Sequence, residues 1–313
     1  MVVGAGAWGT ALALQAMRAG QQVTLWARDP ASVLATRHSP RLPGHYLPDE
    51  IAVTGRLDGI GFDAVLLAVP VQHLASVAGG MPPGAPVVAC AKGLEASTLR
   101  LPLEIIAVAH PGRPAAVLTG PNFAHEVAAG LPAAAVLAAE DAELRTRLAD
   151  LLGSPGFRIY GNDDPVGAQL GGAAKNVIAI AAGAVIGAGL GENARAALIT
   201  RGLAELGRLV LALGGRAETV AGLSGLGDLL LTCTGPASRN YSLGLALGQG
   251  MSLAEILAGR NSVTEGVATA PALVARAAGV DLPVCAAVAA LLAGRLRLDQ
   301  AIAALLARPR RDE

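Results

Sequence analysis

The sequence predicts an α/β fold in two parts, a parallel sheet with covering helices followed by an all-α region. In the first half, short and continuously apolar runs alternate with helix-like stretches, a pattern typical of parallel sheets covered on both faces. After about Gly161 these runs stop, and from Pro165 onward apolar stretches of helical length are separated by Gly or Pro. We therefore predict two domains, residues 1–164 and 165–313.

The predicted strands are short and apolar. They are Met1–Val3, Gln22–Trp26, Asp63–Val69, Pro86–Ala91, Ala115–Thr119, Ala133–Ala138 and Phe157–Tyr160. The first is shorter than the usual length of about five or six residues, so we expect it to lack part of its pairing. Helices are predicted at Ala11–Ala19, Arg195–Leu213, Leu243–Gly248, Leu253–Ala258, Ala270–Ala278, Val284–Ala293 and Leu298–Leu306.

The composition excludes several classes of protein. Only 15% of the residues are charged and the formal net charge is zero, which argues against charged disordered tails and against a nucleic-acid partner. The longest apolar run, Val177–Gly191, is too short and too rich in Gly and Ala to span a membrane. We see no signal peptide and no metal-type spacing among the three cysteines. We expect a cytoplasmic protein without a metal.

A glycine loop follows the first predicted strand. Gly4, Gly6 and Gly9 match the pattern G-x-G-x-x-G, with Ala7 and Trp8 between them. The match alone is weak, but here a strand precedes it, a helix follows, and a second strand comes at the expected distance. The glycines let the backbone approach a pyrophosphate, and the helix N-terminus attracts anions. The loop therefore predicts a Rossmann-type dinucleotide site; a chance Gly-Ala cluster is the alternative.

The end of the second strand bears on the choice of dinucleotide. Arg28 comes first there and Asp29 directly after it. A carboxylate at this place binds the ribose 2′-hydroxyl of NAD, whereas an arginine accommodates the 2′-phosphate of NADP. The order favours NADP, with use of both cofactors left open. The alternative is a solvated turn.

Two lysines stand out among 24 basic residues, because all the others are arginine. Lys92 follows the fourth strand, and Gly120-Pro121-Asn122 follows the fifth. Since ligands bind outside the carboxyl ends of parallel strands, both segments should line one crevice. Lys175 begins a long apolar segment. Burial there would bring the lysine pKa towards neutrality, as a general acid/base requires and arginine cannot provide. Snorkelling to solvent is the alternative.

Further polar groups occur in the second half. Asp228 ends the glycine-dense stretch 222–228. Arg239 lies between Ser238 and Asn240, a set suited to a phosphate; a helix cap with a surface arginine is the alternative. The five histidines show no metal spacing, and each is interpreted as a loop or surface residue.

The chain resembles the bacterial NAD(P)-dependent glycerol-3-phosphate dehydrogenase family. The motifs that carry the resemblance are GAGAWGTALA, AKGLE, TGPNFAHEVAAGLP, GGAAKNVIAI, NARAALITRGLAE, GLSGLGDLLLTCT with SRN, and VTEG, in this order from Gly4 to Gly266. The resemblance implies a cytoplasmic oxidoreductase that acts on a CH–OH group and reversibly reduces dihydroxyacetone phosphate to sn-glycerol 3-phosphate, a precursor in phospholipid synthesis. The sequence departs from the family pattern at Asn122, where Ser or Thr is more common.

The resemblance also implies roles for individual residues. Lys175 matches the proton acceptor of the oxidation direction, and Lys92 matches a contact of both cofactor and substrate. Substrate contacts are implied at Gly120, Asn122, Asp228, Ser238, Arg239 and Asn240. Cofactor contacts are implied at Ala7, Trp8, Arg28, Tyr46, Ala124, Arg239, Val263 and Glu265, in addition to the glycines of the loop.

Two rival functions remain open, together with the state of assembly. A reductase of the same build could act on a hydroxy acid carboxylate, and a nicotinamide-binding sensor would bind without turnover. The apolar all-α half leads us to expect a homodimer.

Overall fold

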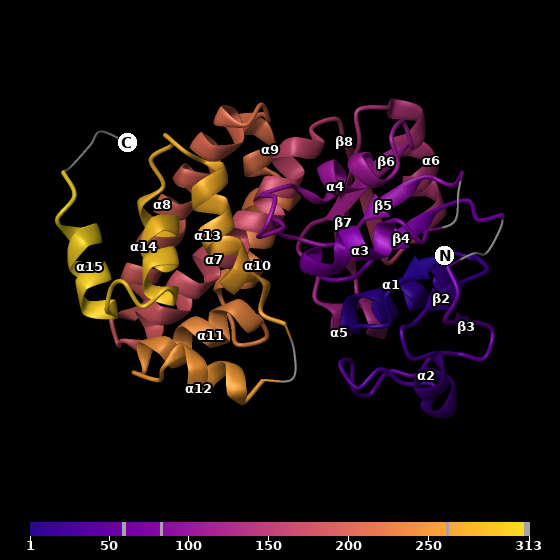
Figure 1. Ribbon diagram of the computed structural model, residues 1–313, viewed down its shortest axis with the longest axis horizontal. Coiled ribbons are helices and arrows are strands. Elements are labelled where there is room, and N and C mark those ends of the chain that lie inside the picture. The colour runs from indigo at the N-terminus through magenta and orange to yellow at the C-terminus, as the bar shows by residue number, and fades with distance from the viewer. Residues whose placement is uncertain (58–60, 82–83, 261–262, 310–313) are drawn as a thin grey trace.

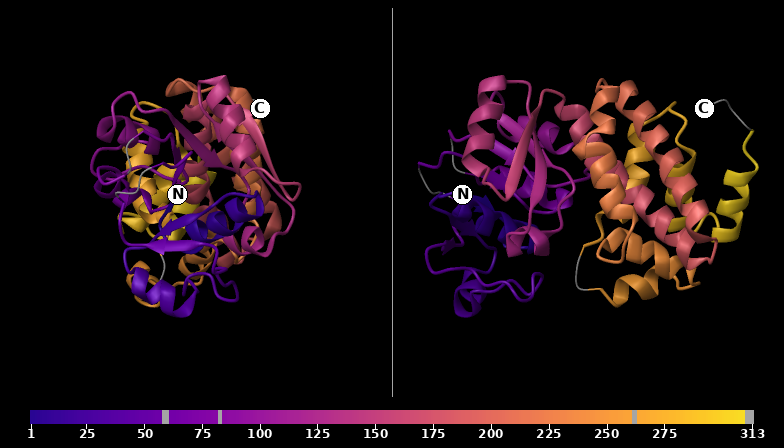
Figure 2. Two further views of the ribbon diagram at one scale, coloured as in Figure 1. Left: turned by 90° about the vertical axis from the view of Figure 1, so that its right-hand side faces the viewer. Right: turned by 180° about the vertical axis from the view of Figure 1, so that it is seen from behind.

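The computed structural model describes residues 1–57, 61–81, 84–260 and 263–309. A strand-rich part and a helical part lie side by side along the long axis of the molecule (Figures 1 and 2). The last strand ends at Asn162, and the first helix of the helical part begins at Pro165. The predicted fold class, a Rossmann-type α/β sheet followed by an all-α region, is confirmed. Residues 261–262 and 310–313 of the predicted second domain lie outside the described residues.

The strands form one eight-stranded sheet in the order β3-β2-β1-β4-β5-β6-β7-β8. They are β1 (Val2–Val3), β2 (Thr24–Trp26), β3 (Ala52–Thr54), β4 (Val65–Leu67), β5 (Val87–Ala89), β6 (Ala115–Thr119), β7 (Ala133–Ala138) and β8 (Phe157–Asn162). Every residue of β1, β4 and β5 is buried, because these central strands are covered on both faces. Strand β1 is only two residues long, yet it pairs with both β2 and β4.

Two details of the sheet differ from the sequence prediction. Strand β3 was not predicted; it is short and partly exposed at the edge of the sheet, so it lacks the apolar run that identifies inner strands. Strand β7 pairs antiparallel with β6, whereas a parallel sheet was expected. The connection contains only α5 (Ala124–Ala129), which is about 9 Å long. This helix is too short to carry the chain back along the roughly 17 Å of β6. Strand β7 therefore begins at the end of the sheet where β6 stops and runs in the opposite direction.

Helices cover both faces of the sheet. They are α1 (Ala7–Arg18), α2 (Pro30–Thr36), the 3₁₀ turn η1 (Val71–His73), α3 (Leu74–Ala78), α4 (Pro102–Ala109), α5 and α6 (Ala142–Leu152). Leu12 of α1 and Leu148 of α6 belong to the core on one face. Leu74 of α3 and Ile106 of α4 belong to the core on the other. Helix α1 begins four residues before its predicted start at Ala11 because the glycine loop leads directly into it.

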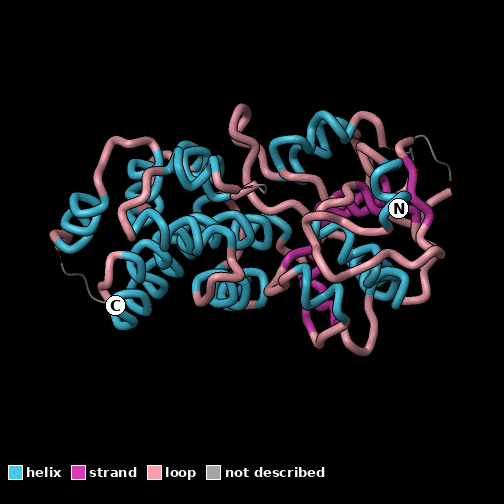
Figure 3. Tube along the Cα trace, turned by 90° about the horizontal axis from the view of Figure 1, so that it is seen from below, coloured by secondary structure: helices cyan, strands magenta, loops and turns pink. Residues whose placement is uncertain are grey.

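The helical part is built around one long central helix, α7 (Pro165–Gly187) (Figure 3). The other elements are α8 (Gly191–Ala212), α9 (Ala217–Ala221), the π-helical turn η2 (Leu223–Gly227), α10 (Asp228–Cys233), α11 (Arg239–Gly248), α12 (Leu253–Ala258), α13 (Glu265–Arg276), α14 (Pro283–Leu292) and α15 (Leu298–Leu306). By length and composition α7 could cross a membrane, but 83% of its most apolar window is buried inside the molecule. In this structure α7 is therefore the core helix of the helical part.

Glycines explain how closely α7 and α11 pack. A Cβ on Gly183 of α7 would lie 2.0 Å from the carbonyl oxygen of Tyr241, and a Cβ on Gly244 of α11 would lie 1.9 Å from that of Ile180. Neither position has room for a side chain. Part of the high glycine content is therefore a packing requirement of the helix pair.

Candidate active site

A buried carboxylate joins the two lysines of the chain. Asp228 is fully buried, and its Oδ2 accepts a hydrogen bond of 2.6 Å from Nζ of Lys92. Its Oδ1 accepts a hydrogen bond from Nζ of Lys175, which is itself 8% exposed. One carboxylate between two ammonium groups leaves an excess positive charge at the crevice. Such a charge favours an anionic ligand.

Each member of this Lys92–Asp228–Lys175 cluster is placed by a different element. Lys92 follows β5, and its ammonium also donates to the carbonyl of Gly120 at 2.9 Å. Lys175 lies in the interior of α7. This helix passes close beside Lys92, because a Cβ on Gly172 would lie 3.4 Å from Cγ of Lys92. The two strand ends predicted to line one crevice, at Lys92 and Gly120, do meet.

Asp228 is presented by an unusual local structure. It is the first residue of α10 and follows η2 directly. Isolated π-turns of this kind are frequent at functional sites. A Cβ on Gly225 within η2 would lie 2.1 Å from the carbonyl oxygen of Val220. The glycine-dense stretch before Asp228 therefore permits the tight turn, and Thr232 braces it by donating to the backbone carbonyl of Asp228 at 2.6 Å.

Burial changes the acid–base behaviour of Lys175. Removal from water lowers its pKa from 10.5 to about 8, a shift that Asp228 opposes and the neighbouring Lys92 reinforces. A lysine in this range can both give and take a proton near neutral pH. The structure thus supplies the condition that the sequence analysis required, whereas the snorkelling alternative needs an exposed ammonium.

Asn122 is turned towards the sheet. Its Nδ2 donates to the carbonyl of Ala134 in β7 at 3.0 Å. Its Oδ1 is buried and has no hydrogen-bond partner among the described residues. The side chain therefore links the Gly120 turn to β7 and leaves one acceptor unused.

The three residues predicted to bind a phosphate, Ser238, Arg239 and Asn240, lie at the N-terminus of α11. Ser238 is buried and caps the helix, accepting from the backbone N–H of Tyr241. Asn240 donates to Asn176 Oδ1 at 2.8 Å and accepts from the N–H of Gly266 at 3.0 Å. The exposed Arg239 donates to the carbonyl of Val263. The helix-cap alternative thus describes Ser238 correctly, and Asn176, which the sequence analysis did not single out, joins α7 to this group. Its signal was its place directly after Lys175.

The glycine loop fits a dinucleotide. Gly4 has φ +115°, and a Cβ on Gly9 would lie 1.7 Å from the carbonyl oxygen of Gly4, so both glycines are required by the turn. At Gly6 an added Cβ would meet nothing within 4 Å among the described atoms, which marks the open side of the loop. Among the described residues, no side chain caps helix α1, and its first turn contains no acid. Its first amides therefore have no side-chain acceptor there and suit a bound pyrophosphate.

The other predicted cofactor contacts lie on several elements of both parts of the molecule. Ala7 and Trp8 begin α1, Ala124 begins α5, Tyr46 is 68% exposed, and Val263 is 44% exposed. Arg28 is exposed after β2, while Asp29 caps α2 by accepting from the N–H of Ser32. Both charges are exposed there, but one carboxylate oxygen of Asp29 is engaged in the helix cap, whereas the guanidinium of Arg28 extends from the strand end.

Glu265 lies near enough to the lysine cluster to be affected by its charges. Burial raises its pKa from 4.5 to about 7, opposed by the charges of Arg239, Lys175 and Lys92. Its Oε2 would lie 4.0 Å from a Cβ built on Gly93, which belongs to the sheet part. Glu265, at the N-terminus of α13, therefore bridges the two halves of the molecule. Only the family motif VTEG pointed to it in the sequence.

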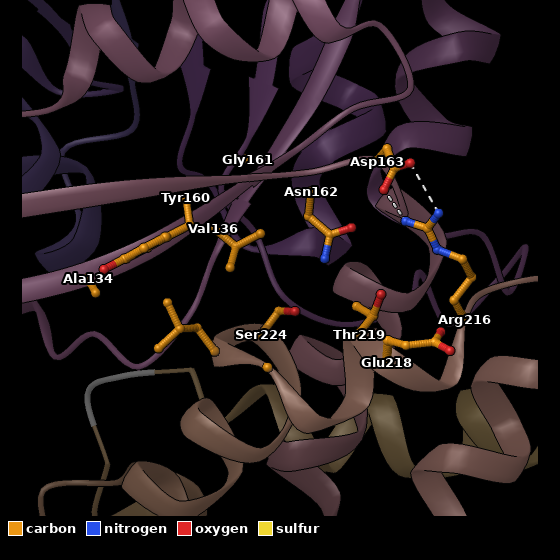
Figure 4. Close-up of a pocket in the computed structure, with 12 residues that line it drawn as sticks. Ala134, Val136, Tyr160, Gly161, Asn162, Asp163, Arg216, Glu218, Thr219 and Ser224 are labelled. Atoms are coloured by element: carbon orange, nitrogen blue, oxygen red, sulfur yellow. Dashed lines mark hydrogen bonds and ion pairs between the residues drawn. The ribbon is translucent and has the colours of Figure 1, made fainter.

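A cavity of about 860 Å³ lies between strands β7 and β8 and the turn from α9 to η2 (Figure 4). Tyr160, Asn162, Thr219 and Ser224 line it, and an ion pair between Asp163 and Arg216 stands at its edge. The three residues of the lysine cluster do not line this cavity. It is therefore distinct from the crevice at the strand ends.

Comparison with known proteins identifies the family. Residues 1–145 match the N-terminal model, and residues 164–303 the C-terminal model, of NAD-dependent glycerol-3-phosphate dehydrogenase. The glycerol-3-phosphate dehydrogenases (NAD(P)+) of Acidiphilium cryptum and Gluconobacter oxydans are 59% and 54% identical to the chain. The alignments cover 100% and 98% of this chain and 97% and 96% of theirs.

Solved structures agree with this assignment. The crystal structure of glycerol-3-phosphate dehydrogenase from Coxiella burnetii superposes with a TM-score of 0.93 at 38% identity, covering 98% of both chains. A ketopantoate reductase from Ralstonia eutropha shares the fold alone, with a TM-score of 0.60 at 19% identity over 96% of this chain and 100% of its own. The chain belongs to the NAD(P)-dependent glycerol-3-phosphate dehydrogenases, a family of oxidoreductases.

Proposed function

We propose that this protein interconverts dihydroxyacetone phosphate and sn-glycerol 3-phosphate with NADP or NAD, and that Lys175 moves the proton. The observation that carries this proposal is the buried contact of Lys175 with Asp228, beside Lys92, at the carboxyl ends of the strands. The bound nicotinamide ring supplies the hydride in reduction and takes it in oxidation. The chain's own residues must therefore orient the substrate and handle the proton.

Lys175 has the proton-transfer role in this scheme. In reduction its ammonium gives a proton to the substrate's carbonyl oxygen as the carbonyl carbon gains the hydride, so a secondary alcohol forms and Lys175 becomes neutral. In oxidation the neutral amine takes the hydroxyl proton. Asp228 holds Lys175 and Lys92 at one place, and Lys92 directs its positive charge at the substrate oxygen. Excluding water from this buried group strengthens each of these interactions.

The phosphate is assigned to the N-terminus of α11, with Ser238, Arg239 and Asn240. The guanidinium of Arg239 is exposed beside the cleft, and a ten-residue helix contributes the positive end of its dipole. Gly120 and Asn122 are assigned to the opposite wall. Binding energy from the non-reacting phosphate would hold the reacting carbon in position.

For the cofactor, we propose a preference for NADP. Arg28 and Asp29 are both exposed at the end of β2, and Oδ1 of Asp29 is engaged as the cap of α2. Replacing Arg28 by Ala should raise KM for NADPH and leave KM for NADH nearly unchanged. A wild-type protein that prefers NADH would contradict this reading.

The wider setting is proposed on the same basis. Residues 1–164 form the cofactor domain and residues 165–313 the substrate domain of a cytoplasmic homodimer, whose product feeds phospholipid synthesis. The dimer is inferred from the apolar character of the helical part. Light scattering of the purified protein tests the dimer directly.

A substrate panel tests the reaction. NADPH absorbance should fall when dihydroxyacetone phosphate is added to the protein. Oxidation of NADPH only with a phosphate-free keto acid would favour the hydroxy-acid reductase. Cofactor binding without oxidation by either substrate would favour the sensor.

A further inference from the structure

The segment that carries Lys92 is held by the helical part of the molecule. Residues 92–101 connect β5 to α4, both elements of the sheet part. Yet Leu94 and Leu101 are buried in the core of the helical part, and Leu99 packs against that core. The position of Lys92 therefore depends on contacts with the second half of the chain.

Helix α13 contacts this segment at three places along one face. Near its start, Oε2 of Glu265 would lie 4.0 Å from a Cβ built on Gly93, and Oγ1 of Thr269 only 2.8 Å from it. At its end, Arg276 donates to the carbonyl of Leu99 at 3.4 Å and to Glu104 at 2.6 Å. Spacings of four and eleven residues place these side chains on the same face, since eleven residues make about three turns.

The contact at Arg276 acts on a strained point of the segment. Leu99 has φ +60°, a left-handed conformation that is strained for a residue with a Cβ. The N–H of Leu99 donates to the carbonyl of Glu95 at 2.8 Å, and the carbonyl of Leu99 accepts from Arg276. Glu104, the partner of the other guanidinium nitrogen, also accepts from the N–H of Leu101 at 2.8 Å. One guanidinium thus holds the far end of the segment at two points.

We propose that Arg276 is a positioning residue for the reaction: by anchoring Leu99 and Glu104 to α13, it holds Lys92 against Asp228 and Lys175. The proposal rests on the proposed function, because it assigns Lys92 a role in turnover. Arg276 itself belongs to none of the contacts made by the lysine cluster.

The test compares Arg276→Met with Arg208→Met. Arg208 lies in α8 and donates to the carbonyl of Asp281 at 3.0 Å, so the control loses a similar bond away from the Lys92 segment. Arg276→Met should lower kcat roughly 10- to 100-fold, as a misplacement of about 1 Å does, with a smaller change in KM for the cofactor. The pH at which the rate of alcohol oxidation rises should also increase. Lys92 lowers the pKa of Lys175, so displacing Lys92 would raise that pKa. Arg208→Met should change neither.

A second readout does not depend on turnover. The chain has two lysines, so labelling with acetic acid N-hydroxysuccinimide ester, followed by peptide mass spectrometry, reports on Lys92 separately from Lys175. Lys92 should react several-fold faster in Arg276→Met than in the wild type or in Arg208→Met. Glu104→Gln, which keeps the arginine, should show the same direction with a smaller effect, and it serves if Arg276→Met does not fold.

The outcomes separate the two proposals. Unchanged kcat, pH profile and Lys92 labelling in a folded Arg276→Met would overturn the positioning role, even if its Tm fell. A wild-type protein without turnover of dihydroxyacetone phosphate would overturn the proposed function. The labelling would then still decide whether Arg276 holds Lys92.

Discussion

Lys175 and Asp228 form a buried ion pair whose carboxylate is shared with a second lysine. The two residues are 53 positions apart in the chain, on α7 and at the start of α10. Desolvation and the second lysine weaken the hold of Lys175 on its proton, and Asp228 strengthens it. The same ion pair therefore joins α7 to α10 and sets the proton affinity of Lys175.

Asp228→Asn should damage both stability and activity. Breaking a buried ion pair by removing one partner typically costs about 3–5 kcal/mol, and here two ammonium groups would lose their counter-charge. Thermal unfolding should show a large fall in Tm. Asp163→Asn is the control, because it breaks an exposed ion pair with Arg216 and should change Tm little. Equal effects of the two variants would contradict the importance of the buried cluster.

Lys175→Arg tests proton transfer separately from charge. Arginine keeps the positive charge but stays protonated at any accessible pH. We expect kcat to fall about 100- to 10,000-fold, the usual contribution of a general acid/base, while the cofactor still binds. Initial rates and cofactor fluorescence titration measure these two quantities. Turnover close to that of the wild type would eliminate Lys175 as the proton donor.

The pKa of Lys175 predicts opposite pH profiles for the two directions. Oxidation needs the neutral amine, so its rate should rise through pH about 8. Reduction needs the ammonium and should decline above that pH.

Because the folded-state pKa of Lys175 lies below the ordinary 10.5, the unfolded chain binds more protons between these values, and the stability of the fold should rise with pH across this window. Lys175→Met should remove that rise, and unfolding measured at pH 8 and pH 10 tests it.

The crossing of α7 and α11 predicts a matched pair of glycine variants. Gly244→Ala would place a Cβ 1.9 Å from the carbonyl oxygen of Ile180, so the helices must separate. Overpacking of this kind costs about 1–3 kcal/mol or more. Gly207→Ala in α8 meets no described atom within 4 Å and should stabilise by up to about 1 kcal/mol, because alanine is the better helix former. Denaturant unfolding measures both, and a harmless Gly244→Ala would refute the close crossing.

Sequence patterns sufficed for most elements of the fold. The buried strands β4 and β5 were recognisable because both of their faces are covered, which leaves a continuous apolar run. Strand β3 lies at the edge of the sheet and is partly exposed, so it has no such run. The predicted direction of β7 was wrong, because the direction depends on the path of the connection through α5 and not on the strand's own residues.

Candidate site residues were found in two ways. Lys92 and Lys175 could be selected from composition and position, and the structure brings them together. Asn176 and Glu265 leave weaker signals, because Asn176 is marked only by its place directly after Lys175 and Glu265 only by the motif VTEG. The engagement of Asn122 with Ala134 is likewise a contact across strands, and single positions in a sequence do not reveal it.

The sequence alone determined the two-part architecture, the glycine loop and the identity of the scarce lysines, because periodicity, turn chemistry and composition are local properties. The tertiary structure decided that Asp228 lies between those lysines, that Lys175 is desolvated, and that α13 holds the Lys92 segment. Burial and charge–charge distances depend on residues far apart in the chain; Lys92 and Asp228 are separated by 136 positions. Only the packing of the helical part against the sheet brings such groups into contact and sets their proton affinity.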